Sequence, residues 1–242
     1  MRYQLYYTPS NPGRGEFIRL PLEEAGAEYV DMARGTGRGQ GADAVQRFLK
    51  NASVKHPPFA QPFLKAGRTV IAQTANILLY LGPKLGLAPK TQAERLWTHQ
   101  LQLTISDLLK EIQDTHHPVA HGLYYEDQKA EALTYSKHFF AERLPKFLGY
   151  FERVLGGANG RVFMVGDALT YADLSMFQLF EGLRFSFPRT MQRLEPGYPG
   201  LAALHDRVAA RPNIAAYLQS PRRMAFNDKG IFRHYPELEE GS

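Results

Sequence analysis

The start of the chain alternates hydrophobic and polar residues and then changes to a helical period. Residues 3–7 have the two-residue period of a short strand, and the segment 8–13, rich in proline and glycine, predicts a loop. Apolar positions over 17–25 recur at helical spacing, and Gly26 is a plausible end for that helix. Pro21 conflicts with the helix because it lacks a backbone donor. The first unit is therefore predicted to be strand, loop and helix.

The following segment predicts a second strand, a mobile loop and a hairpin. The stretch 29–31 suggests a strand, whereas 35–41 contains too much glycine to hold regular structure. Residues 63–65 and 69–71 flank a turn that contains glycine, which indicates a β-hairpin, and a helix is expected over 75–81. The predicted order is β-α-β, a connecting segment, and β-β-α.

After this point proline and glycine interrupt both periods, and the pattern then becomes helical. We expect an N-terminal α/β domain over 1–82, a linker over 83–90, and an all-helical domain with an extended tail over 91–242. One helix start is well marked, because Thr170 and Asp173 have the spacing of a capping box. The amphipathic stretches cover about 91–114, 126–155, 170–186 and 199–219.

Composition and charge narrow the class of protein. The 242 residues are 44% hydrophobic, which is ample for a globular core. No apolar run approaches the roughly 20 residues of a membrane span, so we expect no membrane and a cytoplasmic location. Basic residues are scattered and the net charge is only +5, which gives little support for a nucleic acid partner. Cysteine is absent, which excludes disulfides, thiolate metal sites and a protein thiol as nucleophile.

The predicted order of elements and three residues resemble the cytosolic glutathione transferases. Pro62 precedes the hairpin, and Gln73-Thr74 follows it at the spacing of that family. In the family this proline is cis and the polar pair begins the third helix. The resemblance extends from Tyr3 to about Tyr217 and implies a thioredoxin-like N-terminal domain with a mixed sheet, followed by an all-α helical bundle. The sequence resembles a bacterial-like member of the family, of the tyrosine or the serine type, and the pattern does not select one class.

The chemistry of glutathione accounts for this pattern. The tripeptide has two carboxylates and a central cysteine between peptide groups. The helix that starts at Thr74 offers free N–H groups and a hydroxyl to the γ-glutamyl carboxylate, and Gln73 can bond the same end. A cis Pro62 would turn the backbone of Gln61 toward the cysteinyl part, in a contact like a β-bridge.

Two hydroxyls compete for the role of activating the thiol. The thiolate is the attacking species, and a hydroxyl donor aimed at the sulfur favours it. Tyr7, followed by the segment 13–16, resembles the tyrosine-type classes, whereas Ser10 in the run 10–14 resembles the serine-type classes. Each residue also has a structural interpretation, Tyr7 as a core aromatic of a strand and Ser10 as a turn residue. We favour Tyr7 slightly over Ser10.

Further roles follow from the resemblance. Arg14 is expected to orient the loop or to neutralise a carboxylate, and Lys50 or Arg38 is expected to reach the glycyl carboxylate. In several classes an acid from the neighbouring subunit contacts the glutathione amine. Gln102 is the best match to that position, a departure that leaves this contact open.

The site for an electrophile is expected between the two domains, with His121 and Tyr124 as polar lining groups. His116-His117 is not expected to bind metal, because adjacent residues do not share a helix face and no acid completes the site. The expected function is a homodimeric glutathione transferase of detoxification, which attaches glutathione to a hydrophobic electrophile and transfers alkyl or aryl groups. The alternatives are a non-catalytic binding or interaction protein and a glutathione-dependent isomerase or peroxidase.

Overall fold

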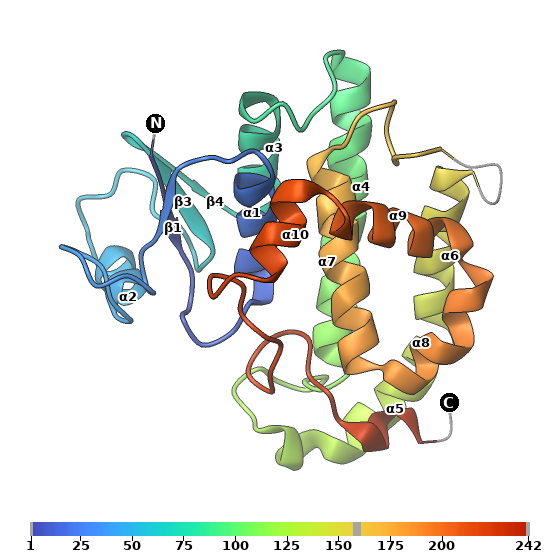
Figure 1. Ribbon diagram of the computed structural model, residues 1–242. Helices are drawn as coiled ribbons and strands as arrows, with labels where there is room; N and C mark the ends of the chain where they lie inside the picture. Colours follow the sequence, from blue (N-terminus) through green and yellow to red (C-terminus); the bar gives the residue numbers. More distant parts are fainter. Residues whose placement is uncertain (1, 157–160, 241–242) are drawn as a thin grey trace.

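The computed structural model describes residues 2–156 and 161–240, and it consists of a small sheet unit beside a larger group of helices (Figure 1). The strand order is β2-β1-β3-β4, with β1 parallel to β2 and antiparallel to β3. This mixed sheet confirms the predicted thioredoxin-like α/β fold. The elements are β1 (Tyr3–Tyr6), α1 (Gly13–Glu24), β2 (Tyr29–Asp31), α2 (Ala44–Leu49), β3 (Phe63–Ala66), β4 (Thr69–Ala72) and α3 (Thr74–Lys84).

Alternation along the strands sends side chains to the two faces of the sheet. Leu5 and Leu64 point to the face covered by α1 and α3, where they pack with Ile18 and Ile77. On the other face the Tyr6 ring stacks on Phe63, with ring centroids 4.6 Å apart, and both contact α2. The sheet therefore has helices on both faces, as a buried sheet requires.

The remainder of the described chain is helical, as predicted. Its core surrounds α7, which packs against α1, α4 and α9. The capping box at the start of α7 is confirmed, because the Asp173 carboxylate accepts from the Thr170 amide at 2.8 Å and from its hydroxyl at 2.7 Å. The helices are α4 (Gln92–Asp114), α5 (Lys129–His138), α6 (Leu144–Leu155), α7 (Tyr171–Ser186), α8 (Pro188–Leu194), α9 (Pro199–Ala209) and α10 (Pro212–Leu218).

Several element boundaries differ from the prediction. Tyr7 lies outside β1, and α3 continues to Lys84, so the expected linker begins inside a helix that contains Pro83. The stretch 126–155 is divided by a π-helical turn over Phe139–Arg143. Pro212 divides the stretch 199–219, because the residue before a proline is held in an extended conformation. Pro21 lies inside α1 without ending it.

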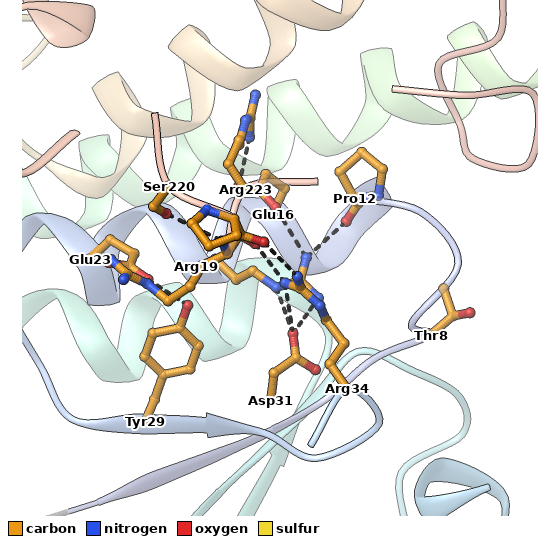
Figure 2. A network of polar contacts seen from close by, with 12 residues as sticks. Thr8, Pro12, Glu16, Arg19, Glu23, Tyr29, Asp31, Arg34, Ser220 and Arg223 are labelled. Carbon is orange, nitrogen blue, oxygen red and sulfur yellow. Dashed lines mark hydrogen bonds and ion pairs between the residues drawn. The ribbon is translucent and has the colours of Figure 1, made fainter. Parts of the chain in front are cut away.

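A buried polar network joins α1 to the C-terminal helices (Figure 2). Glu16 and Arg19 are both fully buried, and the Arg19 guanidinium contacts Glu16 at 3.1 Å and Asp31 at 2.7 Å. The second Glu16 oxygen accepts from the Tyr217 hydroxyl at 2.6 Å and pairs with Arg223 at 2.6 Å. The first turn of α1 is thus tied to the sheet and to residues at the far end of the chain.

The segment after α10 returns across the loop between β1 and α1. The Asn227 side chain donates to the carbonyl of Ser10 at 2.8 Å, and the Asn11 side chain donates to the carbonyl of Lys229 at 3.4 Å. Phe232 is buried against Gly182, where any side chain would clash with its ring. The C-terminal tail therefore closes over the N-terminal part of the fold. None of the helices in 2–156 and 161–240 has the length and apolar character needed to cross a membrane.

Candidate functional site

A cleft of about 580 Å³ lies between the sheet unit and α4, at the N-terminus of α3. The structure brings most of the expected binding residues together in this cleft. From the sheet unit it is lined by Arg14, Phe59, Ala60, Gln61, Pro62, Gln73, Thr74, Ala75 and Asn76, and from α4 by His99, Leu103, Ser106 and Leu109.

Two backbone features shape the wall of the cleft. The peptide bond between Gln61 and Pro62 is cis, and β3 begins directly after it. Gln73 has a φ of 69°, in the left-handed region that residues other than glycine seldom adopt, and it immediately precedes α3. A positive φ at a residue other than glycine is most frequent at ligand sites, where the surrounding structure holds it in place.

The start of α3 presents groups suited to an anion. Thr74 is buried with 7% of its surface exposed, and its hydroxyl oxygen has no hydrogen-bond partner within the described part of the chain. A buried polar group left unpaired costs about 1–3 kcal/mol. The first N–H groups of a helix are also free to donate. A carboxylate at this position would satisfy both the hydroxyl and the helix amides.

The Tyr7 side chain lies between β1 and α1 and is buried. Its hydroxyl oxygen accepts a hydrogen bond from the backbone N–H of Arg14 at 3.0 Å. A Cβ atom added at Gly13 would lie 2.1 Å from this oxygen, so the approach requires glycine. Burial raises the pKa of Tyr7, opposed by the Arg14 N–H and by the charges of Arg14 and Arg19. Tyr7 is therefore a neutral phenol at neutral pH, with its own proton available to donate.

Ser10 has a different environment. It is exposed on the turn before α1, where its hydroxyl exchanges a hydrogen bond with Thr8 at 2.9 Å and accepts one from the Asn11 side chain at 3.2 Å. The serine hydroxyl is thus occupied by neighbouring turn residues. Such contacts are typical of serine in loops.

The Arg14 guanidinium crosses from α1 to α4. Both of its terminal nitrogens donate to the Gln113 side-chain oxygen at 3.3 Å, and the Gln113 nitrogen lies 3.2 Å from Nδ1 of His121. Burial lowers the pKa of Arg14. Sequence reasoning missed Gln113, because a glutamine near the end of a long helix carries no local signal of its role.

Comparison with known proteins identifies the family. Residues 113–221 match the family model described as the C-terminal domain of glutathione S-transferase. The chain is 32% identical to a glutathione S-transferase P of Caenorhabditis elegans, with 89% of this chain and 90% of that protein aligned. It is 30% identical to glutathione S-transferase P 1 of Xenopus laevis, with 91% and 93% aligned.

The chain belongs to the glutathione S-transferase family. A solved Pi-class glutathione S-transferase of Onchocerca volvulus has the same fold, with a TM-score of 0.68, 22% identity, and coverage of 90% of this chain and 93% of that one.

Three other residues that were expected to take part in glutathione binding do not line the cleft. Lys50 follows α2 and Arg38 lies in the loop 35–41, and both are exposed. Gln102 is fully buried, so it does not face a neighbouring subunit. The helical period explains this, because His99, Leu103 and Ser106 occupy the side of α4 that faces the cleft.

The adjacent residues His116 and His117 lie next to the C-terminal tail. Nε2 of His116 bonds the carbonyl of Ile231 at 2.8 Å, and Nδ1 of His116 contacts Nδ1 of His117. Burial lowers the pKa of His116 to about 3, so its imidazole is neutral. Within 2–156 and 161–240, no group of three or more histidine or acidic side chains is placed to hold a metal ion.

Proposed function

We propose that this chain is a glutathione transferase that binds glutathione at the start of α3 and uses Tyr7 to favour its thiolate. The observation that carries the proposal is the Tyr7 hydroxyl, which accepts the Arg14 N–H at 3.0 Å and keeps its own proton for another acceptor. A thiol with a free pKa of about 8.5 is mostly protonated at neutral pH, so a donor to the sulfur increases the reactive fraction.

The cleft supports a specific placement of glutathione. The γ-glutamyl carboxylate would lie at Gln73 and Thr74, where the helix amides and the unpaired hydroxyl converge. The cysteinyl part would lie along Gln61 and Pro62, at the edge of the sheet. Arg14, which lines the same cleft, would lie near the sulfur, where a cation favours the thiolate.

In the proposed reaction the glutathione thiol loses its proton to water. The sulfur then forms a bond to an electrophilic carbon of the second substrate. With an aryl halide the halide departs with the electron pair of its bond to carbon, and with an alkene the π-electron pair moves to the neighbouring carbon, which takes a proton from water. The Tyr7 hydroxyl donates to the sulfur until the new bond forms. Since reduced glutathione is held in the cytosol, we infer a cytoplasmic location.

The direct test is turnover with purified protein. Conjugation should be measured with a panel of aryl halides and alkenes, and peroxidase activity with organic hydroperoxides. Conjugation that depends on glutathione and exceeds the spontaneous rate is expected. Glutathione binding without turnover of any compound would indicate a non-catalytic binding protein, and reduction of hydroperoxides alone would indicate a peroxidase.

Replacement of Thr74 by valine is expected to weaken glutathione binding by about 10- to 100-fold, because the carboxylate loses a hydroxyl donor worth about 1.5–3 kcal/mol. Isothermal titration calorimetry measures this directly. The control is Thr134→Val on α5, an exposed threonine whose hydroxyl donates to the Ala130 carbonyl of its own helix at 3.0 Å. Equal affinities of the Thr74→Val variant and the unaltered protein would contradict this placement of the carboxylate.

We also infer a homodimer, and exposed apolar side chains at the mouth of the cleft support it. Phe59 is 93% exposed and Leu103 is 47% exposed, and both line the cleft. Apolar groups in such positions are commonly covered by a partner. A second copy seated here would complete the glutathione site.

The substitution Phe59→Ser is therefore expected to convert the dimer to a monomer, as measured by sedimentation velocity. Removing a large apolar side chain from an interface costs about 2 kcal/mol or more, which lowers the association constant by a factor of about 30. Val162→Ser is the matched control, since Val162 is 51% exposed and lies away from the cleft lining. Dimers that persist in Phe59→Ser would contradict this interface.

A further inference from the structure

Arg233, in the C-terminal tail, is a half-buried cation without a matching anion. Its Nε donates to the carbonyl of Gly230 at 2.9 Å, and no carboxylate of the described residues forms an ion pair with it. By contrast, the Arg19 guanidinium is paired with Asp31 at 2.7 Å and the Arg143 guanidinium with Glu111 at 2.6 Å. Burying an unpaired charge is costly, and a bound anion would remove that cost.

Packing contacts connect Arg233 to the proposed reacting centre. The Gly230 carbonyl accepts the hydrogen bond from Arg233. Gly230 also packs on Asn11, since a Cβ atom added at Gly230 would lie 3.3 Å from the Asn11 side-chain oxygen. A Cβ atom added at Gly13 would lie 2.6 Å from this Asn11 oxygen and 2.1 Å from the Tyr7 hydroxyl oxygen. The two oxygens therefore border the same small space. A turn of the tail thus places Arg233 beside the loop that holds Tyr7.

The same stretch of tail also contacts the end of α4. Its Ile231 carbonyl is bonded to His116, and the positive charge of Arg233 contributes to the lowered pKa of both His116 and His117. The Glu126 carboxylate is exposed and raises the pKa of His117, and among the described residues it forms no ion pair with Arg233. Arg233 therefore lies near enough to both histidines for its positive charge to act on them.

We propose that Arg233 binds an anionic group, most simply a carboxylate, on the electrophilic substrate. This inference rests on the proposed function. A guanidinium presents donors in a planar fork that matches the two oxygens of a carboxylate. Arg14, whose charge also acts on Tyr7, donates to the neutral Gln113 side-chain oxygen, so a second positive charge lies near Tyr7. The second substrate is thus an electrophile with its reactive carbon at the sulfur and its carboxylate at Arg233.

The test compares two glutathione conjugates that differ only in one charge. One is the conjugate formed from chloro-dinitrobenzoate, and the other carries the methyl ester in place of the aryl carboxylate. Both contain the same glutathione part, so the ratio of their affinities in titration calorimetry isolates the aryl carboxylate. The full-length protein is expected to bind the carboxylate conjugate at least about tenfold more tightly, the ratio that one charge-assisted contact provides.

Three variants decide the origin of this preference. Arg233→Met is expected to abolish it and to leave the affinity for the ester conjugate unchanged, whereas Arg233→Lys keeps part of it. Arg193→Met removes an equal charge from an exposed position on α8 and should keep the full preference. If Arg233→Met weakens the binding of both conjugates, the Arg233→Lys variant decides. A preference for the carboxylate conjugate that persists in Arg233→Lys supports the site, and complete loss of that preference in Arg233→Lys overturns the inference.

Three other results would overturn the inference. Equal affinity of the full-length protein for the two conjugates, or an equal fall in preference in Arg193→Met and Arg233→Met, would exclude a specific contact at Arg233 and leave the transferase proposal intact. Failure of both conjugates to bind at all would overturn the glutathione site, and this inference with it.

Discussion

Replacement of Tyr7 by phenylalanine is expected to lower kcat/KM for glutathione conjugation at neutral pH by about 10- to 100-fold. This is the effect of losing one hydrogen bond to a charged group, which is worth about 1.5–3 kcal/mol. The Tyr7 hydroxyl is held by the Arg14 N–H at 3.0 Å and is buried, and a phenylalanine ring has no donor to take its place. The loss should appear in kcat, with little change in glutathione affinity.

The Tyr7→Phe substitution is also expected to shift the pH dependence of activity in a defined direction. The donor from Tyr7 stabilises the thiolate and so lowers the pKa of the bound thiol. Without it the pKa of the thiol rises, the acid limb of the kcat/KM profile moves to higher pH, and activity recovers partly in alkaline solution. Absorbance of the thiolate in the ultraviolet, followed through a pH titration with glutathione bound, measures the same shift independently of turnover.

Two matched variants test the assignment to Tyr7. Tyr6→Phe removes the hydroxyl of a neighbouring tyrosine that faces α2 and lies 3.4 Å from the Gln4 side chain, so the thiol pKa should stay unchanged. Ser10→Ala should also leave it unchanged, because the Ser10 hydroxyl is already bonded within an exposed turn. A raised thiol pKa in Ser10→Ala with none in Tyr7→Phe would assign activation to the serine.

The second large effect is expected for Glu16→Gln, which should lower the free energy of unfolding by about 3–5 kcal/mol. The fully buried Glu16 carboxylate contacts two guanidiniums, Arg19 at 3.1 Å and Arg223 at 2.6 Å. Loss of its charge leaves both cations less compensated, although Arg19 retains Asp31 at 2.7 Å. Urea unfolding at a fixed protein concentration measures the change.

The control for Glu16→Gln is Glu131→Gln on α5, an exposed acid that should change stability by less than about 0.5 kcal/mol. A double variant, Glu16→Gln with Arg223→Met, should regain part of the loss, since it removes one of the uncompensated charges. If Glu16→Gln is as stable as the control, the network in Figure 2 contributes no net stability.

The features that the sequence predicted well depend on neighbouring residues. The capping box at Thr170 and Asp173 requires only three residues of spacing, and the hairpin of β3 and β4 only a short turn between apolar runs. The glutathione-binding candidates around Pro62 and Gln73 came instead from the resemblance to the glutathione transferases, and the hairpin and the helix after it bring them together in one cleft. Local chemistry is sufficient for the capping box and the hairpin.

Element boundaries were less predictable, since they depend on packing. Glycine and proline after residue 81 suggested a linker, yet α3 continues through Pro83, and Gly82 packs tightly against the Tyr171 ring. The expected partner-facing residue Gln102 proved to be buried. A long helix with apolar residues on more than one side does not reveal which face meets the core until its neighbours are placed.

The sequence alone indicated the capping box and the β3–β4 hairpin, because each is encoded in short-range spacing, and its resemblance to the glutathione transferases implied the mixed sheet followed by helices. Only the tertiary structure decided that Arg14 meets Gln113 on α4, that Glu16 is held by Tyr217 and Arg223, and that the tail seats Gly230 against Asn11. These contacts join residues far apart in the chain. Their geometry follows from the packing of whole helices, which no local pattern of residues specifies.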